Sequence, residues 1–396
     1  MWCKTILKLK STFRLAQFRS VTKLMNELED NNPEDKMHAW QIHAYNGLDD
    51  LRFTNLRIPV VRNPMDVLVK VDAASVNPID IAMTRGYGMN LLNLMRKTNC
   101  SREYDEIELP LTLGRDFAGI VVSKGYGVGD KLELGEEVWG VVPVEKQGCH
   151  ANYVVVNSNM VRSRPRRLSH IEAASILYCG LTAWSALWYT GGLYYKNLLA
   201  VRNRQVLVMG GSGGVGTIAI QLLKAWNMHV TSTCSDDAVE SLRNLGADVV
   251  IDYRQNDADE QIISEGPYDI ILDCAKQGPE YVREKGYLYN TYITLNSPML
   301  KNFDQHGLIL GALQNLGDIA RFNIPIAQNK GCVKWGYFMP NQTGINFLQE
   351  LVESGKIIPV VQQVYPFKDL PLAYKRASQG HLRGKLVIDM KSTRDD

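Results

Sequence analysis

The sequence predicts an α/β protein of two domains, one built from short strands and the other from alternating strands and helices. The length of 396 residues is too great for one small core. Short apolar runs punctuated by glycine and proline fill the chain before residue 160, and strand and helix patterns alternate afterwards. A glycine-rich turn also lies between a predicted strand and a predicted helix near residue 210.

Composition and charge exclude several classes of function. The hydrophobic fraction of 45% and the charged fraction of 22% are typical of a soluble globular protein. The first 24 residues hold six lysines and arginines and no acid, which leaves 38 of the 44 basic residues against all 42 acidic ones. The body of the protein is therefore mildly acidic, and nothing in it predicts binding to nucleic acid.

Two long uncharged segments, 173–195 and 205–223, are long enough to span a membrane. Both contain several glycines, so they are interpreted as buried elements of a soluble domain and no transmembrane span is predicted. The seven cysteines lie singly along the chain without a C-x-x-C pair. This spacing argues against a disulfide framework and against a zinc site built from cysteines.

Residues 1–36 are predicted to be a mitochondrial presequence followed by a polar linker. Apolar residues recur at intervals of four and three and fall on one side of a helical wheel, away from the basic residues: Trp2, Ile6, Leu9, Phe13 and Ala16. A basic amphipathic helix without acids is typical of mitochondrial targeting, with the matrix favoured. The alternative is a basic surface helix or tail. Folded structure is expected to begin near Met37.

The strongest local motif is a G-x-G-x-x-G sequence formed by Gly211, Gly213 and Gly216. It follows an apolar strand at 206–209 and opens a predicted helix, and a second strand follows at 229–233. In this context the glycines let the backbone approach a pyrophosphate at the helix N-terminus. The motif predicts a dinucleotide-binding site.

The end of the second strand favours NADPH over NADH. An NAD site usually places an acid there to bind the ribose hydroxyls. This chain has Cys234 and Ser235 first, and its two aspartates follow only afterwards. A small hydroxyl leaves room for a 2′-phosphate, which Tyr253 or Arg254 could cover.

With these motifs placed, residues 37–396 resemble the zinc-independent quinone oxidoreductase branch of the medium-chain dehydrogenase/reductase superfamily. The similarity is carried by the segments VDAASVNPIDIAMTRGYG, LTLGRDFAGIVV, LGEEVWGVVP, AASILYCGLTAWSALW, LRNLGADVVIDYR and SQGHLRGKLVIDM. The resemblance implies a GroES-like β-barrel catalytic domain plus a Rossmann domain with a doubly wound parallel sheet. The catalytic domain would comprise 37–163 and return at 351–396, and the Rossmann domain that binds NADPH would comprise 164–350.

The resemblance also bears on metal binding. Zinc-dependent members of the superfamily bind their catalytic metal through a Cys where this chain has Asn77 and through a His in a Gly-His-Glu segment. Here that segment is Gly114-Arg115-Asp116. A guanidinium stays protonated and cannot ligate zinc, so no metal site is predicted. Arg115 and Asp116 are instead expected to form a structural pair near the cleft, and direct contact with the substrate is the alternative.

Two residues are candidates for catalysis. Tyr87 lies in a segment that lines the cleft of the family and could donate a proton or orient the substrate; the alternative is an aromatic packed at a barrel turn. Asn77 is expected to touch the nicotinamide or the substrate, or else to form the turn before Pro78. Asp80 is expected to cap the following helix.

The expected cofactor-binding residues fall into two groups. The motif and the strand after it supply the first: Ser212, Gly213, Gly214, Val215, Gly216, Ser235 and Tyr253. Segment resemblance alone supplies the second: Leu295, Phe338, His381 and Arg383. A polar strip containing His381, Arg383 and Lys385 could close over the phosphates.

Two segments depart from the pattern of the branch. The loop CAKQGPE, residues 274–280, replaces a Val-Gly-Gly-like turn, which puts the backbone contacts near the nicotinamide in doubt. Residues 89–109 are an insertion with a helical apolar cluster. This insertion could form a lid over the cleft or pack on its own barrel.

Three hypotheses of function follow. The first is a mitochondrial, NADPH-dependent, zinc-free reductase of a quinone or quinone-like acceptor, linked to ubiquinone metabolism, because such acceptors take a hydride directly at carbon. The second is a 2-enoyl thioester reductase with Tyr87 as proton donor. The third is an NADPH-binding interaction scaffold, for which the resemblance implies a reticulon partner. A homodimer is compatible with all three.

Overall fold

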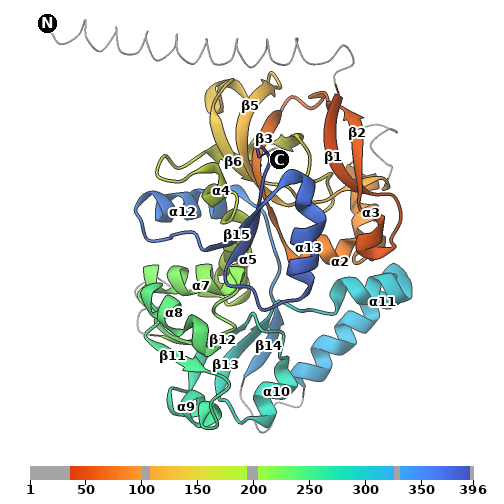
Figure 1. Ribbon diagram of the computed structural model, residues 1–396. Helices are drawn as coiled ribbons and strands as arrows, with labels where there is room; N and C mark the ends of the chain where they lie inside the picture. The colour runs from red at the N-terminus through yellow and green to blue at the C-terminus, as the bar shows by residue number, and fades with distance from the viewer. Residues whose placement is uncertain (1–35, 100–107, 194–203, 325–330, 393–396) are drawn as a thin grey trace, which may run out of the picture.

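The computed structural model describes residues 36–99, 108–193, 204–324 and 331–392 (Figure 1). The predicted presequence and most of the linker lie outside these ranges. The strand-rich domain occupies the upper half of Figure 1 and the parallel-sheet domain the lower half, and the blue C-terminal segment returns to the upper one. No helix in the described part of the chain is long and apolar enough to cross a bilayer.

The strand-rich domain is organised around β3 (Asp66–Val76), whose eleven residues are almost all buried. A seven-stranded sheet runs in the order β15-β16-β3-β5-β6-β8 with β7 also paired to β3, and a smaller sheet has the order β2-β1-β4. Valines at alternate positions of β3 point into one core, because successive side chains of a strand face opposite sides. The other strands are β1 (Lys36–Ile42), β2 (Arg52–Arg57), β4 (Leu111–Thr112), β5 (Asp116–Lys124), β6 (Glu137–Val141), β7 (Tyr153–Asn157), β8 (Val161–Ser163), β15 (Val361–Pro366) and β16 (Lys385–Asp389).

Within the described ranges, four α-helices and several 3-10 turns complete this domain. Helix α3 covers the first part of the insertion, and its Leu92 is buried in one cluster with Ile42 and Leu111 of the same domain. Asn90 on the same helix donates to the backbone carbonyls of Phe303 and Asp304 in α11 (Met299–Asn323), so the described part of the insertion contacts both domains. Residues 100–107 lie outside the described ranges, and the choice between a lid and a segment packed on its own barrel stays open. The helices are α2 (Pro78–Met83), α3 (Met89–Asn99), α4 (His170–Ala173) and α13 (Leu370–Ser378), and the 3-10 turns are η1 (Gly47–Asp50), η3 (Gly129–Lys131), η4 (Ser158–Met160) and η8 (Phe367–Asp369).

The second domain contains a six-stranded parallel sheet in the order β11-β10-β9-β12-β13-β14. The chain runs outward from β9 in one direction and then restarts at β12 on its other side. In such sheets ligands bind beyond the carboxyl ends of the strands at this reversal. The strands are β9 (Gln205–Met209), β10 (His229–Cys234), β11 (Val249–Asp252), β12 (Tyr268–Asp273), β13 (Tyr289–Thr294) and β14 (Cys332–Trp335).

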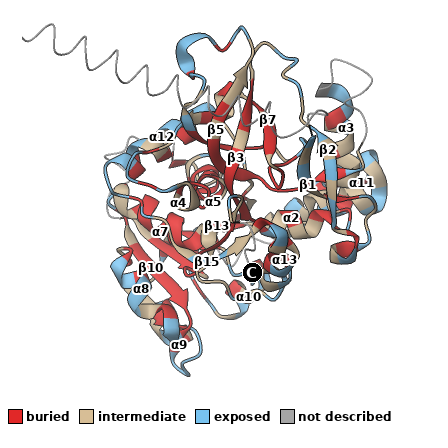
Figure 2. Ribbon diagram, turned by 45° about the horizontal axis from the view of Figure 1, so that its top comes forward, coloured by how far each residue is buried: buried red, intermediate tan, exposed pale blue. Residues whose placement is uncertain are grey.

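The two domains share a hydrophobic core. Ala73, Ala118 and Trp139 of the barrel belong to the same buried cluster as Val206 and Leu222 of the parallel-sheet domain. Figure 2 shows buried residues along β3 and β5 of the barrel sheet and along α5 beside them. The helices of this part are α5 (Leu177–Ser185), η5 (Ala186–Thr190, a π-helix), α7 (Gly214–Ala225), η7 (Asp236–Ala238), α8 (Val239–Asn244), α9 (Ala258–Ser264), α10 (Pro279–Glu284) and α12 (Gln342–Glu353).

Helix α11 (Met299–Asn323), which lies between β13 and β14 in the chain, is a helical hairpin of two arms rather than one straight helix. Gly307 has a φ of 72° inside it, and the backbone there reverses direction. The side chain of Asn302 on the first arm donates to Asn315 and Asp318 on the second arm, at 2.8 Å in each case. Polar side chains therefore lie between the two arms.

The C-terminal segment connects the barrel to the glycine-rich loop. Gly384 forms a parallel bridge with Gly213, and its N–H donates to the carbonyl of Ser212 at 2.8 Å. Gly384 has a φ of 88°, and a Cβ there would come within 2.1 Å of the Val360 carbonyl oxygen. Only glycine fits this position.

We therefore expect Gly384→Ala to lower the free energy of unfolding by about 2 kcal/mol or more, because it adds a steric clash to an unfavourable φ. Urea unfolding measures the change. Gly286→Ala is the matched control, since Gly286 has a φ of 75° and a Cβ added there would meet nothing within 4 Å. Equal losses in the two variants would contradict a tight contact at Gly384.

Candidate functional site

The glycine-rich loop has the predicted strand, turn and helix around it. Strand β9 ends at Met209, and α7 begins at Gly214. A Cβ on Gly216 would lie 2.5 Å from the carbonyl oxygen of Gly210, so the helix can pack this closely on the loop only without a side chain there. A Cβ on Gly213 would meet no neighbour nearer than 3.8 Å. The loop thus has open space at the N-terminus of α7, where a phosphate binds favourably.

Arg383 forms a fork of hydrogen bonds next to this loop. Its Nη1 donates to Ser212 Oγ at 3.3 Å and its Nη2 to Ser235 Oγ at 2.5 Å. Its Nε and Nη2 also donate to the Asp237 carboxylate, at 2.8 and 2.9 Å. Asp237 raises the pKa of Arg383, and Arg383 lowers that of Asp237. Three residues predicted to bind the nucleotide, Ser212, Ser235 and Arg383, are therefore brought together around one cation.

Lys385 is buried at the junction of the two domains. Its ammonium donates to the carbonyl of Val76 at 3.2 Å and to the side-chain oxygen of Asn77 at 2.5 Å. The stem of Lys385 also lies 2.9 Å from the position that a Cβ on Gly214 would take. This lysine therefore connects the turn after β3 with the start of α7.

A buried carboxylate supports Asn77 from the other side. The amide of Asn77 donates to Asp116 Oδ1 at 3.0 Å, and Ser75 donates to the same oxygen. The second oxygen of Asp116 accepts the backbone N–H of Tyr178 at 3.2 Å. Asp80 accepts the N–H of Asn77 at 2.9 Å and so completes a capping box from within α2, whereas the residue that precedes the helix as its N-cap is Asn77 rather than Asp80 as expected. Asn77 is thus held in one orientation by a network of hydrogen bonds.

The expected pairing of Arg115 with Asp116 is wrong. Arg115 instead pairs with Asp80, with 3.7 Å between Nε and Oδ1, and it donates to the carbonyls of Pro143 and Lys146 at 2.9 and 2.8 Å. Both members of this pair are fully buried. Adjacent residues at the start of a strand project to opposite sides, so Arg115 and Asp116 face different environments.

Two tyrosines lie close together where the turn after α2 approaches the loop after β14. Burial raises the pKa of Tyr87, and Asp304 raises it further. Burial raises the pKa of Tyr337 to about 12, with Tyr87 also raising it. The Tyr337 hydroxyl is buried, and the nearby Ser297 side chain partly offsets the rise in its pKa. Both phenols therefore remain protonated at neutral pH and can donate a hydrogen bond.

An aromatic stack lies next to Lys385. The rings of Tyr178 and Phe338 stack with 4.3 Å between centroids, and the ammonium of Lys385 lies 6.0 Å from the centre of the Tyr178 ring. Leu295 packs against the hydrophobic core that the two domains share, as Tyr178 and Phe338 also do. Its backbone N–H donates to the carbonyl of Asp273. Leu295 and Phe338 thus follow β13 and β14 at the carboxyl edge of the sheet.

The unusual loop 274–280 is organised by the buried carboxylate of Asp273. This carboxylate accepts the N–H groups of Ala275, Gln277 and Gly278 at 2.9–3.3 Å and the Tyr292 hydroxyl at 2.6 Å. Lys276 has a φ of 62°, a left-handed conformation that is uncommon for a side chain larger than glycine. These hydrogen bonds hold the loop in a defined conformation, although it lacks the Val-Gly-Gly-like turn of the branch.

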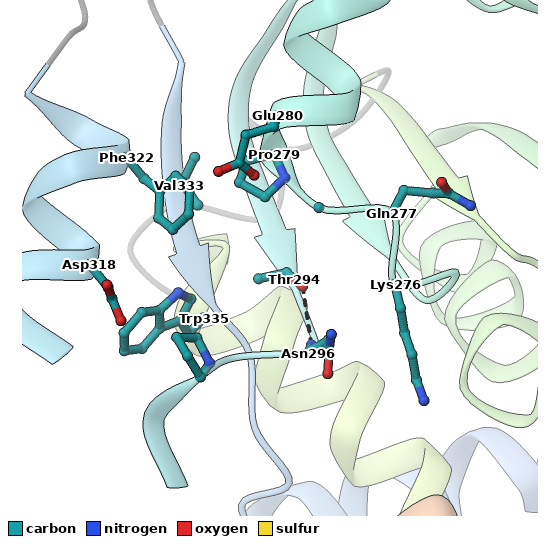
Figure 3. Close-up of a pocket in the computed structure, with 12 residues that line it drawn as sticks. Lys276, Gln277, Pro279, Glu280, Thr294, Asn296, Asp318, Phe322, Val333 and Trp335 are labelled. Carbon is teal, nitrogen blue, oxygen red and sulfur yellow. Dashed lines mark hydrogen bonds between the residues drawn. The ribbon is translucent and has the colours of Figure 1, made fainter. Parts of the chain in front are cut away.

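This loop lines a cavity of about 380 Å³ beside α11. Trp335, Phe322 and Val333 form its apolar side, and Thr294 and Asn296 lie at the end of β13 (Figure 3). In Figure 3 the Lys276 side chain points away from the aromatic side. The cavity adjoins the carboxyl ends of β13 and β14, on the α10 and α11 side of the sheet.

The remaining predicted residues lie further from this network. Tyr253 is about half exposed, with the guanidinium of Arg254 5.7 Å from the centre of its ring. His381 is exposed with a φ of 48°, and its carbonyl accepts a hydrogen bond from Arg376. The predicted polar strip therefore consists mainly of Arg383 and Lys385.

Sequence reasoning missed several residues that the structure brings to the junction. Lys385 was assigned only to a strip near the phosphates, and Tyr178, Tyr337 and Asp273 were not singled out. Tyr178 lies in a segment that carries the family resemblance and Tyr337 directly precedes Phe338, but the burial of their hydroxyls could not be predicted from the sequence. The hydrogen bond between Lys385 and Asn77 joins residues 308 positions apart, which no local pattern indicates.

The residues present do not fit a zinc ion at the position that the family would use. Asn77 is engaged by Lys385 and Asp116, and Arg115 is paired with Asp80. No cluster of three potential ligands from His, Cys, Asp and Glu occurs among the residues that the structure describes. An amide and a permanently protonated guanidinium are not zinc ligands.

Comparison with known proteins matches the two parts of the chain separately. Residues 63–166 match the alcohol dehydrogenase GroES-like domain, and residues 245–388 match the zinc-binding dehydrogenase family. The mitochondrial NAD(P)H oxidoreductase RTN4IP1 of Drosophila melanogaster is 46% identical over 91% of this chain and 88% of its own length. The mitochondrial reticulon-4-interacting protein 1 of Caenorhabditis elegans is 34% identical over 89% of this chain and 94% of its own length.

A solved structure has the same arrangement of domains. The quinone oxidoreductase from Coxiella burnetii superposes with a TM-score of 0.69 at 26% identity. The superposition covers 90% of this chain and all of the other.

The buried ion pair generates a stability prediction. Arg115→Met leaves Asp80 charged and buried, so the free energy of unfolding should fall by about 3–5 kcal/mol. Urea unfolding is the measurement. Arg164→Met is the control, because the partner of Arg164, Glu137, is about half exposed and such pairs contribute about 1 kcal/mol or less. If Arg115→Met cost no more than the control, the pair would not be structural.

Proposed function

Because the chain belongs to the medium-chain dehydrogenase/reductase superfamily, in the family of the mitochondrial NAD(P)H oxidoreductases, we propose that it uses NADPH to reduce a quinone or quinone-like acceptor. The family assignment and the combination of a GroES-like domain with a Rossmann domain confirm the predictions from sequence. The protein is an oxidoreductase that binds a nicotinamide dinucleotide in its Rossmann domain. The domain boundaries expected at residues 163 and 350 stay predictions.

The preference for NADPH is supported by the fork of Arg383. The end of its guanidinium faces the hydroxyls of Ser212 and Ser235, so one cation and two hydroxyls converge beyond the end of β10. The Asp237 carboxylate also accepts from Arg383 and Ser235, so a 2′-phosphate would compete with this carboxylate for the guanidinium. A planar guanidinium recognises phosphate by parallel hydrogen bonds. This cluster is the observation that carries the proposal, because it offers a 2′-phosphate a charge partner that NADH would not use.

The remaining cofactor residues follow from the geometry of the loop. Gly213, Gly214, Val215 and Gly216 would hold the pyrophosphate at the start of α7, and Leu295 and Phe338 would border the nicotinamide at the ends of β13 and β14. Tyr253 would cover the adenosine end. Bound NADPH would supply the hydride; the side chains of the protein position the acceptor and provide a proton.

The acceptor is proposed to be reduced without a metal. Its oxygen then needs a hydrogen-bond donor where negative charge develops. Tyr87 and Tyr337 have raised pKa values and remain protonated, so either phenol can donate. Asn77 is held rigidly by Lys385 and Asp116, which suits a residue that orients the nicotinamide or the substrate.

The cellular setting follows from the relatives. We propose that the protein resides in the mitochondrion, in the matrix, and that its acceptor belongs to ubiquinone metabolism. The name of the Caenorhabditis elegans relative refers to interaction with a reticulon, and the same partner is proposed here. A 2-enoyl thioester reductase and a non-catalytic interaction scaffold are the alternatives that the experiments below distinguish.

The first experiment tests the nucleotide preference. Arg383→Ala should weaken NADPH binding by about 10- to 100-fold, because it removes charge-assisted hydrogen bonds worth about 1.5–3 kcal/mol, and it should change NADH binding little. Titration calorimetry with both nucleotides measures this. Arg243→Ala, at an exposed residue of α8, is the control for loss of a positive charge elsewhere in the same domain. An equal loss for NADH and NADPH would show that Arg383 does not bind the 2′-phosphate.

The second experiment tests the reaction. The purified protein should oxidise NADPH with a short-chain ubiquinone analogue, and Tyr87→Phe should lower kcat by about 100-fold or more with little change in KM. Asn77→Ala should mainly raise KM, and Tyr126→Phe, at a tyrosine that is 89% exposed, is the control.

Turnover confined to enoyl thioesters would favour the second hypothesis. Stoichiometric NADPH binding without oxidation against quinones, enones and enoyl thioesters would favour the scaffold.

A further inference from the structure

A turn at residues 84–88 joins α2 to α3 and carries Tyr87. Tyr87 lies between Gly86 and Gly88, whose φ angles are 78° and 81°, a conformation that side chains larger than glycine rarely adopt. The N–H of Tyr87 donates to the carbonyl of Ala82 at 3.3 Å, so α2 holds the first half of the turn. The second half takes its partners from the other domain.

Asp304, on the first arm of α11, holds this second half. Its carboxylate accepts the N–H groups of Gly88 and Asn90, at 2.5 and 3.1 Å, one on each oxygen. The first N–H groups of a helix have no partner within the helix, and a negative charge is favoured beside them. Asp304 therefore caps the N-terminus of α3 from the parallel-sheet domain, 216 positions from Gly88 in the sequence.

The contact is reciprocal. The side chain of Asn90 donates to the backbone carbonyls of Phe303 and Asp304, at 3.0 and 3.3 Å. Gly88 is also closely packed, since a Cβ there would lie 3.2 Å from Cδ1 of Leu300 in α11. Helices α3 and α11 lie next to each other in both Figure 1 and Figure 2. The turn is thus fixed on the other domain by hydrogen bonds and by packing.

Asp304 is itself held in place. Asn302, two residues earlier on the same arm, donates to Asn315 and Asp318 on the second arm of the hairpin. These bonds fix the first arm against the second. Because both oxygens of Asp304 accept backbone N–H groups, its carboxylate is committed to the turn and is not a free base.

The charge of Asp304 also acts on the phenol of Tyr87. Burial raises the pKa of Tyr87, and Asp304 raises it further because a nearby negative charge disfavours a phenolate. Tyr337, which follows β14, also interacts with Tyr87 and is itself protonated. Arg85 of the same turn extends toward Gly47, with its Nε 3.6 Å from the position that a Cβ there would take. Asp304 thus favours the protonated phenol, which is the form that can donate.

We propose that Asp304 is a positioning residue of the reaction: by capping α3 from the opposite domain, it fixes the turn that carries Tyr87 at the place where the acceptor is reduced. The inference rests on the proposed function, in which Tyr87 donates to the acceptor oxygen. Asp304 acts through Tyr87 and touches neither the acceptor nor the nucleotide.

A purely structural contact between the domains would have different consequences. Its loss would lower activity by the same factor whether or not residue 87 carries a hydroxyl. A residue that acts through the phenol loses its effect once the hydroxyl is gone, so the two substitutions are not additive.

The first test is steady-state oxidation of NADPH by the full chain with a short-chain ubiquinone analogue, from about pH 6 to about pH 10. Asp304→Asn should lower kcat about 10-fold with little change in KM, because a misplaced donor stabilises the transition state less. The alkaline limb of the kcat profile should move to lower pH, because Tyr87 loses its proton more readily without the carboxylate charge.

Asp248→Asn is the matched control. The Asp248 carboxylate also accepts a backbone N–H, from Val230 at 2.7 Å, but it lies beside β10 and β11, at the opposite edge of the parallel sheet from β14. This variant should keep the kcat and the pH profile of the wild-type chain. Thermal unfolding confirms that both variants are folded.

A double-substitution cycle tests whether Asp304 acts through Tyr87. In a Tyr87→Phe chain, Asp304→Asn should lower kcat by less than about 2-fold further. A loss of about 10-fold in both backgrounds would overturn the proposal. A strong loss in Tyr87→Phe together with a wild-type kcat and pH profile in Asp304→Asn would overturn this inference and leave the proposed function in place, whereas full turnover by Tyr87→Phe would overturn both.

Hydrogen–deuterium exchange tests the contact without any turnover. A carboxamide has one acceptor oxygen, so Asp304→Asn can bond only one of the two amides of Gly88 and Asn90. Exchange at one or both should become at least about 10-fold faster, and Asp248→Asn should leave both unchanged. Unchanged exchange at both amides in Asp304→Asn would show that this carboxylate does not hold the turn, whatever the chain reduces.

Discussion

The contact between the C-terminal segment and the glycine-rich loop is the constraint on which the rest of the site depends. Gly384 bonds to the loop through its backbone, Arg383 reaches the hydroxyls at the nucleotide end, and Lys385 reaches Asn77 at the barrel end. Three consecutive residues, Arg383 and Gly384 before β16 and Lys385 at its first position, thus connect parts of the chain that are distant in sequence. The nucleotide loop cannot shift relative to Asn77 without breaking these bonds.

Replacement of the zinc ligands of the superfamily changes what the same fold can do. Arg115 and Asn77 have become parts of hydrogen-bonded networks, and their buried partners Asp80 and Asp116 order the turn after β3. Oxidation of an alcohol loses its Lewis acid in such a site, whereas reduction of an activated carbonyl requires only positioning and a donor. Both requirements can be met by rigid side chains and protonated phenols.

The sequence alone predicted those features that are local. The strand, glycine turn and helix around residue 210 follow from spacing, whereas the N-cap of α2 is Asn77 and not the expected Asp80. The partner of Arg115, the contacts of Arg383 and the meeting of Tyr87 with Tyr337 depend on residues tens to hundreds of positions apart. The hairpin of α11 was also missed, because its outer face carries the apolar residues that usually point into a core.

The central claim is that Ser212, Ser235 and Arg383 form the 2′-phosphate site at the contact between the two domains. A crystal structure of the NADPH complex tests it most directly. We expect phosphate oxygens within about 3 Å of the Arg383 guanidinium and of at least one serine hydroxyl. An NADPH complex in which Arg383 remains bonded only to Asp237 and the serines, with the 2′-phosphate elsewhere, would contradict the account.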